Sequence, residues 1–152
     1  MTLALQQACG AKVDVQVLCD TPGDWYAGER ALLGTADSAG HVREVLLHCD
    51  QQAKVAARTV YGESGPTHGA LSSLRTLGTR PLGDLLFASG QPQWLTREWG
   101  TLDERSPLFS LVRRAIGETR DPCWARRTLF LYEGTRLLVT EIFLPPMFPS
   151  CA

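Results

Sequence analysis

The chain has 152 residues, the size of one ordinary domain, and we expect a single domain over residues 1–152. Its 15 basic and 16 acidic residues leave a net charge of -1, so it lacks the positive field that attracts nucleic acid or an anionic membrane surface. The sequence contains no run of about 18 apolar residues, the length that a membrane-spanning helix requires. These totals exclude a nucleic-acid-binding protein and predict a soluble protein, which we expect to be a monomer.

The cysteines and histidines give no sign of a metal site. The five cysteines are scattered and contain no C-x-x-C pair, which predicts neither a disulfide framework nor a zinc site. Five unpaired thiols are typical of a reducing compartment, so we expect a cytoplasmic location. The three histidines also lack the spacing of a metal site or of a catalytic triad.

The N-terminal 35 residues contain three expected elements. Val13, Val17 and Asp20 have helical spacing and favour a helix, although the valines from position 13 to 17 also alternate as in a strand. Residues 21–24, Thr-Pro-Gly-Asp, have the composition of a turn. Residues 30–35 are expected to form a short strand.

Two strands joined by a tight turn are expected next. Residues 41–49 and 54–61 are rich in β-branched and apolar side chains, and residues 50–52 are too few for anything but a turn. The pair is therefore predicted to be an antiparallel hairpin. On its second strand Arg58 lies among alanines, which leave space beside it.

The remainder of the chain alternates between helices and strands. We expect a short helix ending at Gly78, an ordered bend over residues 79–87, and a strand over residues 94–102. A helix capped by Ser106 is then predicted, with Pro107 in its first turn. Two further strands are expected, joined by a hairpin turn at residues 133–134: 123–132 and 137–145. The sequence therefore predicts an α+β fold, with a single antiparallel sheet of about six strands and helices packed on it.

Two charged residues interrupt otherwise apolar strands. Glu141 lies in Leu-Leu-Val-Thr-Glu-Ile-Phe-Leu-Pro (137–145), and Arg58 lies in Val-Ala-Ala-Arg-Thr-Val (55–60). A buried carboxylate requires a partner, protonation or a polar ligand. The pair can be explained in two ways, as a structural ion pair or strand-edge charges, or as a functional site.

Five segments, in this order and spacing, resemble the bacterial chorismate pyruvate-lyase family: REVLL (43–47), ARTV (57–60), LGTRPLG (77–83), WARR (124–127) and TEIFLP (140–145). The resemblance implies an antiparallel sheet with helices. It also implies a cytoplasmic lyase that converts chorismate to 4-hydroxybenzoate and pyruvate, the entry step to the ubiquinone ring, without metal or organic cofactor.

The resemblance also implies roles for individual residues. By motif, Arg58 would bind the ring carboxylate, Glu141 would lie beside the ring hydroxyl, and Leu82 would contact the ligand through its backbone. A further family contact, a methionine, falls near Thr21 and Pro22, where this chain has no methionine and the proline has no N–H to donate.

The chemistry of chorismate suits such residues. An arginine fork matches a planar carboxylate, and aromatisation of the ring drives the elimination, so the protein mainly has to bind, orient and exclude water. Whether Glu141 is the general base or only positions the substrate stays open. The cation for the second carboxylate also stays open among Arg127, Arg126 and Arg80.

Two alternatives from other classes remain at this stage. One is a sensing or binding domain of similar fold, which holds an aromatic acid without turnover. The other is a structural domain in which Arg58 and Glu141 merely pair. The enzymatic interpretation requires both side chains to project into one dry chamber.

Overall fold

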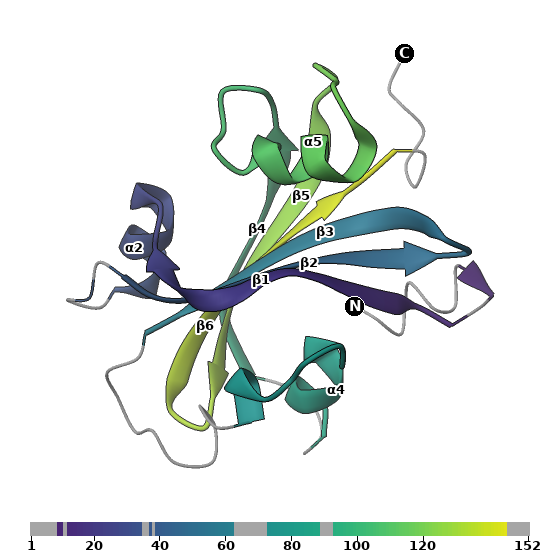
Figure 1. Ribbon diagram of the computed structural model, residues 1–152. Coiled ribbons are helices and arrows are strands. Elements are labelled where there is room, and N and C mark those ends of the chain that lie inside the picture. Colours follow the sequence, from purple (N-terminus) through teal and green to yellow (C-terminus); the bar gives the residue numbers. More distant parts are fainter. Residues whose placement is uncertain are drawn as a thin grey trace.

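The computed structural model describes residues 9–10, 12–34, 37, 39–62, 73–88 and 93–145. Its strands form one antiparallel sheet in the order β1-β2-β3-β6-β5-β4, which confirms the predicted α+β class (Figure 1). The strands are β1 (Asp14–Asp24), β2 (Ala39–Cys49), β3 (Gln52–Tyr61), β4 (Gln93–Leu102), β5 (Cys123–Tyr132) and β6 (Thr135–Phe143). The helices are α2 (Ala27–Leu33), α4 (Leu82–Leu86) and α5 (Phe109–Ile116).

Both predicted hairpins are confirmed. The turn between β2 and β3 has positive φ angles at Asp50 (50°) and Gln51 (64°). The turn between β5 and β6 has them at Glu133 (48°) and Gly134 (81°). Positive φ at both central residues is the geometry that matches the right-handed twist of the flanking strands.

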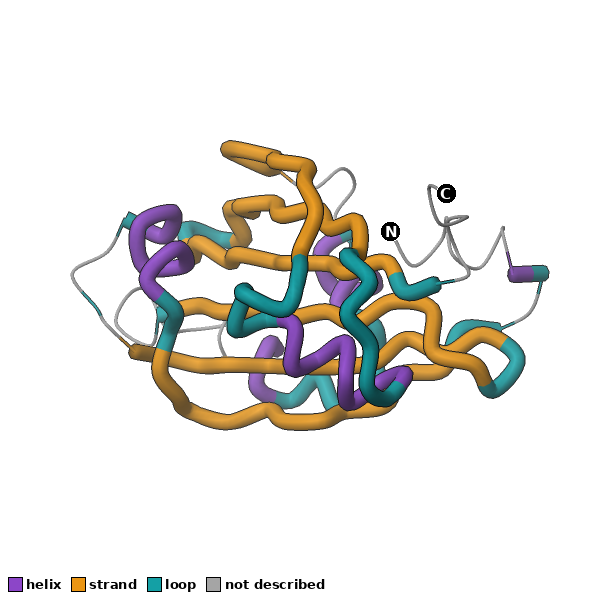
Figure 2. Tube along the Cα trace, turned by 90° about the horizontal axis from the view of Figure 1, so that it is seen from above, coloured by secondary structure: helices purple, strands orange, loops and turns teal. Residues whose placement is uncertain are grey.

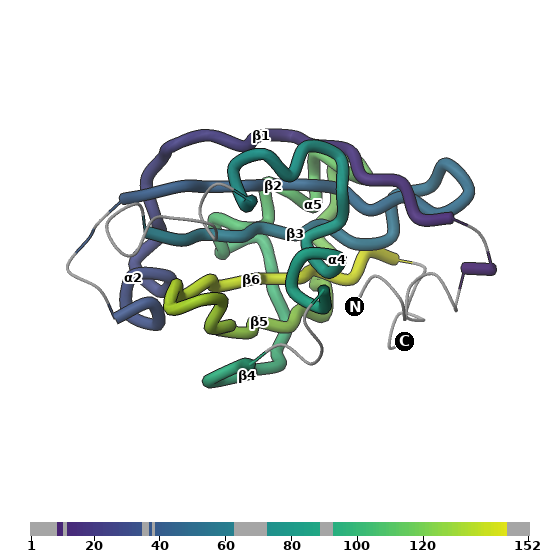
Figure 3. Tube along the Cα trace, turned by 90° about the horizontal axis from the view of Figure 1, so that it is seen from below, coloured from purple at the N-terminus to yellow at the C-terminus, as the bar shows by residue number. Residues whose placement is uncertain are grey.

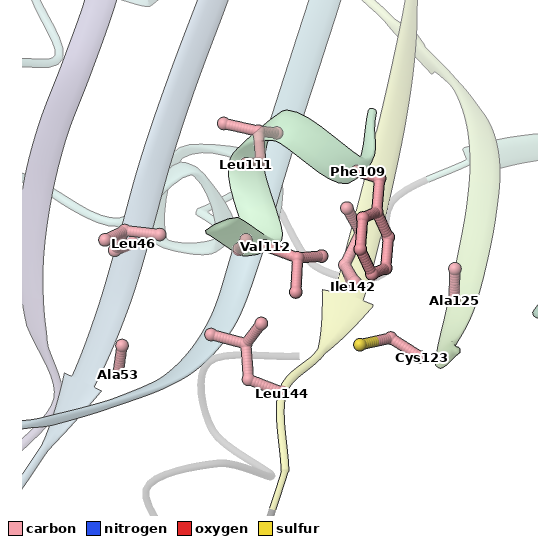
Figure 4. Close-up of a cluster of buried hydrophobic side chains, with 10 residues drawn as sticks. Leu46, Ala53, Phe109, Leu111, Val112, Cys123, Ala125, Ile142 and Leu144 are labelled. Carbon is pink, nitrogen blue, oxygen red and sulfur yellow. The ribbon is translucent and has the colours of Figure 1, made fainter. Parts of the chain in front are cut away.

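One face of the sheet, called here the α5 face, carries α2 and α5. Its residues Leu46, Ala56 and Ile142 pack with Val112 of α5 in a buried cluster (Figure 4). A second cluster on this face joins Leu33 of α2 to the strands. Figure 2, seen from above, shows helices lying in front of the strands. The apolar side of α5 therefore fixes one end of this face and α2 the other.

The opposite face, called here the α4 face, lies under the segment that contains α4. Tyr61, Leu137 and the half-buried Phe130 form a cluster there with Leu74 and Leu82. Figure 3, seen from below, shows this segment in front of the sheet. A second patch of this face, built around Val45, Val55 and Phe143, buries the valines that precede and begin β1.

The N-terminal helix is not found where residues 12–24 are described. Residues 14–24 form β1 instead, and Val15 and Val17 pair with β2. The alternation of the valines therefore decided the structure, because it directs them onto the apolar strand beside them. The predicted turn at residues 21–24 is also wrong. Pro22 is tolerated in β1 because that strand is at the edge of the sheet.

Residues 27–33 form α2, so the short strand expected at residues 30–35 is wrong. The backbone N–H of Tyr26 donates to the Glu29 carboxylate (2.8 Å), which closes the first turn. Gly34 ends the helix with a φ of 64°, in the left-handed region. Alanine, arginine and leucine between these caps are strong helix formers, and the caps outweigh the strand-like appearance of the sequence.

The other predicted elements are confirmed with shifted ends. The helix predicted from Ser106 begins as α5 at Phe109, after a turn in which the Leu108 N–H donates to the Ser106 hydroxyl (3.3 Å). Residues 73–75 are helical, and the rest of the expected helix from residue 70 lies outside the described residues. The bend expected over residues 79–87 contains α4. None of the helices formed by the described residues is long and apolar enough to cross a membrane.

The expectation of five free thiols is wrong for one pair. Cys9 and Cys49 form a disulfide with a Cα–Cα distance of 6.1 Å. The cause is the register of β1 on β2, which places Asp14 opposite His48 and so brings the residues just before β1 beside the end of β2. A sequence separation of 40 residues gives no sign of this proximity.

Candidate functional site

Arg58 and Glu141 project from opposite faces of the sheet. In the pairing of β3 with β6, Arg58 is opposite Thr140 and Glu141 is opposite Ala57. Directly opposed residues share a face and neighbours along a strand alternate, so the two charges point apart. The expectation that they face one chamber is wrong, and so is the hypothesis that they pair with each other.

Arg58 is instead neutralised on the α5 face. Its Nε and Nη2 donate to the two carboxylate oxygens of Glu29 (2.8 and 2.9 Å), and its Nη1 donates to Glu44 (2.7 Å). The guanidinium also lies 4.2 Å from the centre of the Tyr26 ring. Two carboxylates and an aromatic ring occupy this arginine completely. Its bonds to Glu29 attach α2 to the sheet.

The electrostatics of this cluster are those of a closed ion-pair network. Burial lowers the pKa of Arg58, but its hydrogen bonds to Glu29 and Glu44 and the charge of Glu29 outweigh this effect and raise the pKa above its usual value. The nearby Cys19 thiol has a raised pKa, first because of burial and second because of the Glu44 charge. Neither group offers a free charge to a ligand.

Arg43 is the buried arginine that shares the α4 face with Glu141. It lies on β2 opposite Thr59, and its side chain is almost fully buried. Its Nη1 donates to Asp20 (2.8 Å), and its Nη2 donates to the backbone carbonyls of Gly78 (2.9 Å) and Arg80 (3.2 Å). Arg43 therefore ties the segment before α4 to the sheet.

Glu141 has a cationic surrounding of its own. Arg126, opposite it on β5, donates from Nε to the Glu141 carboxylate (2.5 Å) and lies 5.4 Å from the Trp99 ring centre. Arg97 on β4 donates to the Thr128 hydroxyl (3.1 Å). Burial lowers the pKa of Arg97, and the positive charge of Arg126 lowers it further, while Glu141 partly offsets both. Arg126 and Glu141 are therefore close enough to Arg97 to affect it electrostatically.

These residues form two parallel rows across the α4 face. The first row runs through directly opposed residues from β1 to β4: Asp20, Arg43, Thr59, Val139, Thr128 and Arg97. The second row, two residues further along β6, runs from β2 to β4: Val45, Ala57, Glu141, Arg126 and Trp99. Together the rows contain three guanidinium groups and two carboxylates.

The spacing of the rows suits a small aromatic acid. Glu141 and Arg43 lie on strands two inter-strand spacings apart, roughly 10 Å. In the two rows that contain Glu141 and Arg43, the strand between them contributes the short side chains of Ala57 and Thr59. The arrangement can hold a carboxylate at one end of a ring and a hydroxyl at the other.

The other residues suggested by the sequence divide between the faces. Leu82 begins α4 and packs on the α4 face, two residues after the Arg80 carbonyl that accepts from Arg43. Pro22 lies on β1 opposite His41, near the same site. Arg127 pairs with Glu98 (2.6 Å) and shares the α5 face with Thr140, so it cannot serve a ligand bound at Glu141. Arg126 can.

The sequence contained a signal for Arg43 that its neighbours obscured. Arg43 has the same parity as Val45 and Leu47, which predicts an inward-facing cation on β2. The alanines around Arg58 instead suggest space for a ligand beside β3, on the face that does not carry Glu141. A bulge between Leu47 and His48 shifts the hairpin register by one residue and places Glu44, not Arg43, opposite Arg58.

Comparison with solved structures identifies the fold class. The ligand-binding domain of a protein assigned to the GntR family of transcriptional regulators in Bordetella bronchiseptica matches with a TM-score of 0.63 and 11% identity, covering 89% of this chain and 84% of that one. A GntR-family regulator from Enterococcus faecalis V583 matches with a TM-score of 0.61 and 10% identity, covering 88% and 95%. The sheet therefore belongs to a fold that is also found in regulator domains, the chorismate lyase-like fold.

Sequence comparison gives the family. The family model described as chorismate lyase matches residues 1–151, and this chain belongs to that family. A protein named "Probable chorismate pyruvate-lyase" from Thiobacillus denitrificans is 37% identical over 80% of this chain and 65% of its own length, so the chain spans just under two thirds of that relative. Proteins of the same name from Azoarcus sp. and Methylococcus capsulatus are each 35% identical over 95% of this chain, and over 78% and 88% of their own lengths.

Proposed function

We propose that this protein is a cytoplasmic, cofactor-independent lyase that converts chorismate to 4-hydroxybenzoate and pyruvate and so supplies the ubiquinone ring. The observation that carries the proposal is the presence of Arg43 and Glu141 on one sheet face, with only short side chains between them. Membership of the chorismate lyase family supports the substrate class.

The ring carboxylate of the substrate binds Arg43. This guanidinium already orders the backbone around Gly78 and Arg80, so it is held in a fixed orientation before the ligand arrives. Lysine would supply the charge but not the planar fork that orients a carboxylate. The backbone of Leu82, which follows the Arg80 carbonyl along the chain, contacts the ligand on the side of α4.

Glu141 lies at the opposite end of the ring. The hydrogen on the ring carbon that bears the hydroxyl leaves as a proton, the bond between the adjacent ring carbon and the ether oxygen breaks, and the ring becomes aromatic. The leaving group departs as the enolate of pyruvate and takes up a proton. Glu141 hydrogen-bonds the hydroxyl and accepts the ring proton, while its bond to Arg126 holds the carboxylate in position.

The reaction is tested by incubating the purified protein with chorismate in the presence of a metal chelator. We expect 4-hydroxybenzoate and pyruvate to form in equal amounts, well above the uncatalysed background. Glu141→Gln should lower kcat by about 100-fold or more and change the Kd of 4-hydroxybenzoate much less, because general base catalysis contributes about that factor. Equal losses of turnover and binding would remove the catalytic role of Glu141.

Glu98→Gln is the matched control. Glu98 also pairs with an arginine of β5, Arg127, but on the α5 face and in an exposed position. This variant should keep both activity and binding.

The similarity to regulator structures favours one second candidate, an aromatic-acid sensing domain. Such a domain would bind 4-hydroxybenzoate tightly and release no pyruvate from chorismate. The same incubation separates the two functions, because turnover is expected only from the lyase.

A further inference from the structure

The two ends of the first row are both arginines. Arg43 on β2 and Arg97 on β4 are separated by Thr59, Val139 and Thr128, all short side chains. Four inter-strand spacings place their Cα atoms roughly 19 Å apart. A row of this kind is suited to a ligand that carries an anion at each end.

Glu141 lies midway between these arginines. It is on β6, two strands from Arg43 on β2 and two strands from Arg97 on β4, in the adjacent row. A ligand with its reacting carbon at Glu141 can therefore direct one substituent toward each arginine. In chorismate the ring carboxylate is opposite the hydroxyl-bearing carbon, and the enolpyruvyl group is attached beside that carbon.

The arginines near β4 have unused capacity for an anion. Within the described part of the chain, Arg97 forms no ion pair; it donates to Thr128 and lies 5.0 Å from the Trp94 ring centre. Arg126 shares the single carboxylate of Glu141. Two guanidinium groups therefore face one carboxylate. Burial lowers the pKa of Arg97, and the positive charge of Arg126 lowers it further. A second carboxylate would relieve this repulsion.

We propose that Arg97 and Arg126 bind the enolpyruvyl carboxylate of the substrate, while Arg43 binds the ring carboxylate. The inference rests on the proposed function and deepens it, because it names the subsite that separates the substrate from the product. 4-Hydroxybenzoate has lost the second carboxylate and makes no use of Arg97. Pyruvate keeps this carboxylate when it leaves, so the remaining complex with 4-hydroxybenzoate has the contacts to Arg43 and Glu141 and lacks those of the second carboxylate.

Binding of two stable ligands tests the subsite without any need for turnover. 3-(Carboxymethoxy)-4-hydroxybenzoate carries a second carboxylate beside the hydroxyl, and 4-hydroxybenzoate does not. By isothermal titration calorimetry, Arg97→Gln should weaken the dicarboxylate about tenfold, as expected for loss of one charge-assisted contact, and 4-hydroxybenzoate less than twofold. The KM for chorismate should rise by the same factor as the Kd of the dicarboxylate.

Arg127→Gln is the matched control, since Arg127 is a neighbouring arginine that projects from the other face. It should leave the affinity for both ligands unchanged. An Arg97→Gln variant that binds both ligands as the wild type does, or that loses both equally, overturns the subsite. Absence of pyruvate from the wild-type protein would instead refute the proposed function, while the selective loss of the dicarboxylate would still establish the subsite.

Discussion

Each face of the sheet buries one arginine of the β2–β3 hairpin, and the two arginines differ in what surrounds them. On the α5 face, Arg58 faces Glu29 and Glu44 and has no charge left over. On the α4 face, Arg43 faces a single carboxylate, Asp20, and two backbone carbonyls. A buried cation surrounded by two anions holds a structure together, whereas one on a face with more cations than anions can bind an anionic ligand.

The largest expected effect concerns stability and the α5 face. Arg58→Leu leaves Glu29 buried without its partner and the partly buried Glu44 without the shorter of its two ion pairs, so the free energy of unfolding should fall by about 3–5 kcal/mol. Urea unfolding followed by circular dichroism measures the change. The affinity of the folded fraction for 4-hydroxybenzoate should be unchanged, and loss of binding at a matched folded fraction would contradict the division between the faces.

If that variant does not fold, Glu29→Gln with Arg58→Met supplies a second measurement. Removing both charges should recover part of the stability lost by the single arginine variant, because a neutral pair costs less to bury than one uncompensated carboxylate.

The next effect concerns binding and the α4 face. Arg43→Lys keeps the charge but removes the fork, so the Kd of 4-hydroxybenzoate should rise about 10- to 100-fold, the equivalent of about 1.5–3 kcal/mol for hydrogen bonds to a charged group. Calorimetric titration measures it. Arg58→Lys is the matched substitution on the other face and should not alter the Kd. The comparison fails if the two lysine variants lose affinity equally.

The smallest effect compares two buried threonines. Among the described residues, the Thr140 hydroxyl on the α5 face has no hydrogen-bond partner, so Thr140→Val should raise the free energy of unfolding by up to about 1 kcal/mol. The Thr128 hydroxyl on the α4 face accepts a hydrogen bond from Arg97, so Thr128→Val should lower it by about 1 kcal/mol. Opposite signs in parallel urea titrations support the comparison, whereas two changes of the same sign would refute it.

The strands of the C-terminal two thirds could be predicted because alternation and turn residues agree there. Glu133-Gly134 marks one hairpin, and residues 50–51 mark the other. The beginning of the chain was mispredicted for a physical reason. The valines of β1 fit both periods, and only the apolar strand beside them selects the extended form. In residues 27–33, which overlap the strand expected at residues 30–35, the capping carboxylate of Glu29 favours a helix instead.

The candidate site could be predicted in part. The sequence suggests Glu141 as a candidate because one carboxylate in an apolar strand is conspicuous, and Leu82 because of its motif. The partner of Glu141 could not be predicted, since the face of each residue on β3 relative to β6 depends on a register that no local pattern records. The bulge after Leu47 also shifts the pairing of β2 with β3 by one residue. A single step of register decides whether Arg43 or Arg58 shares a face with Glu141.

Glu29 accepts hydrogen bonds from the first turn of α2 and from the guanidinium of Arg58 at the same time. The Glu29 side chain thus couples formation of the seven-residue helix α2 to the neutralisation of Arg58 beneath it. We expect α2 to open only when the whole domain unfolds, with amide exchange as slow as in the central strands. Position 29 should also accept almost no other amino acid, since the side chain of aspartate is too short and that of glutamine carries no charge.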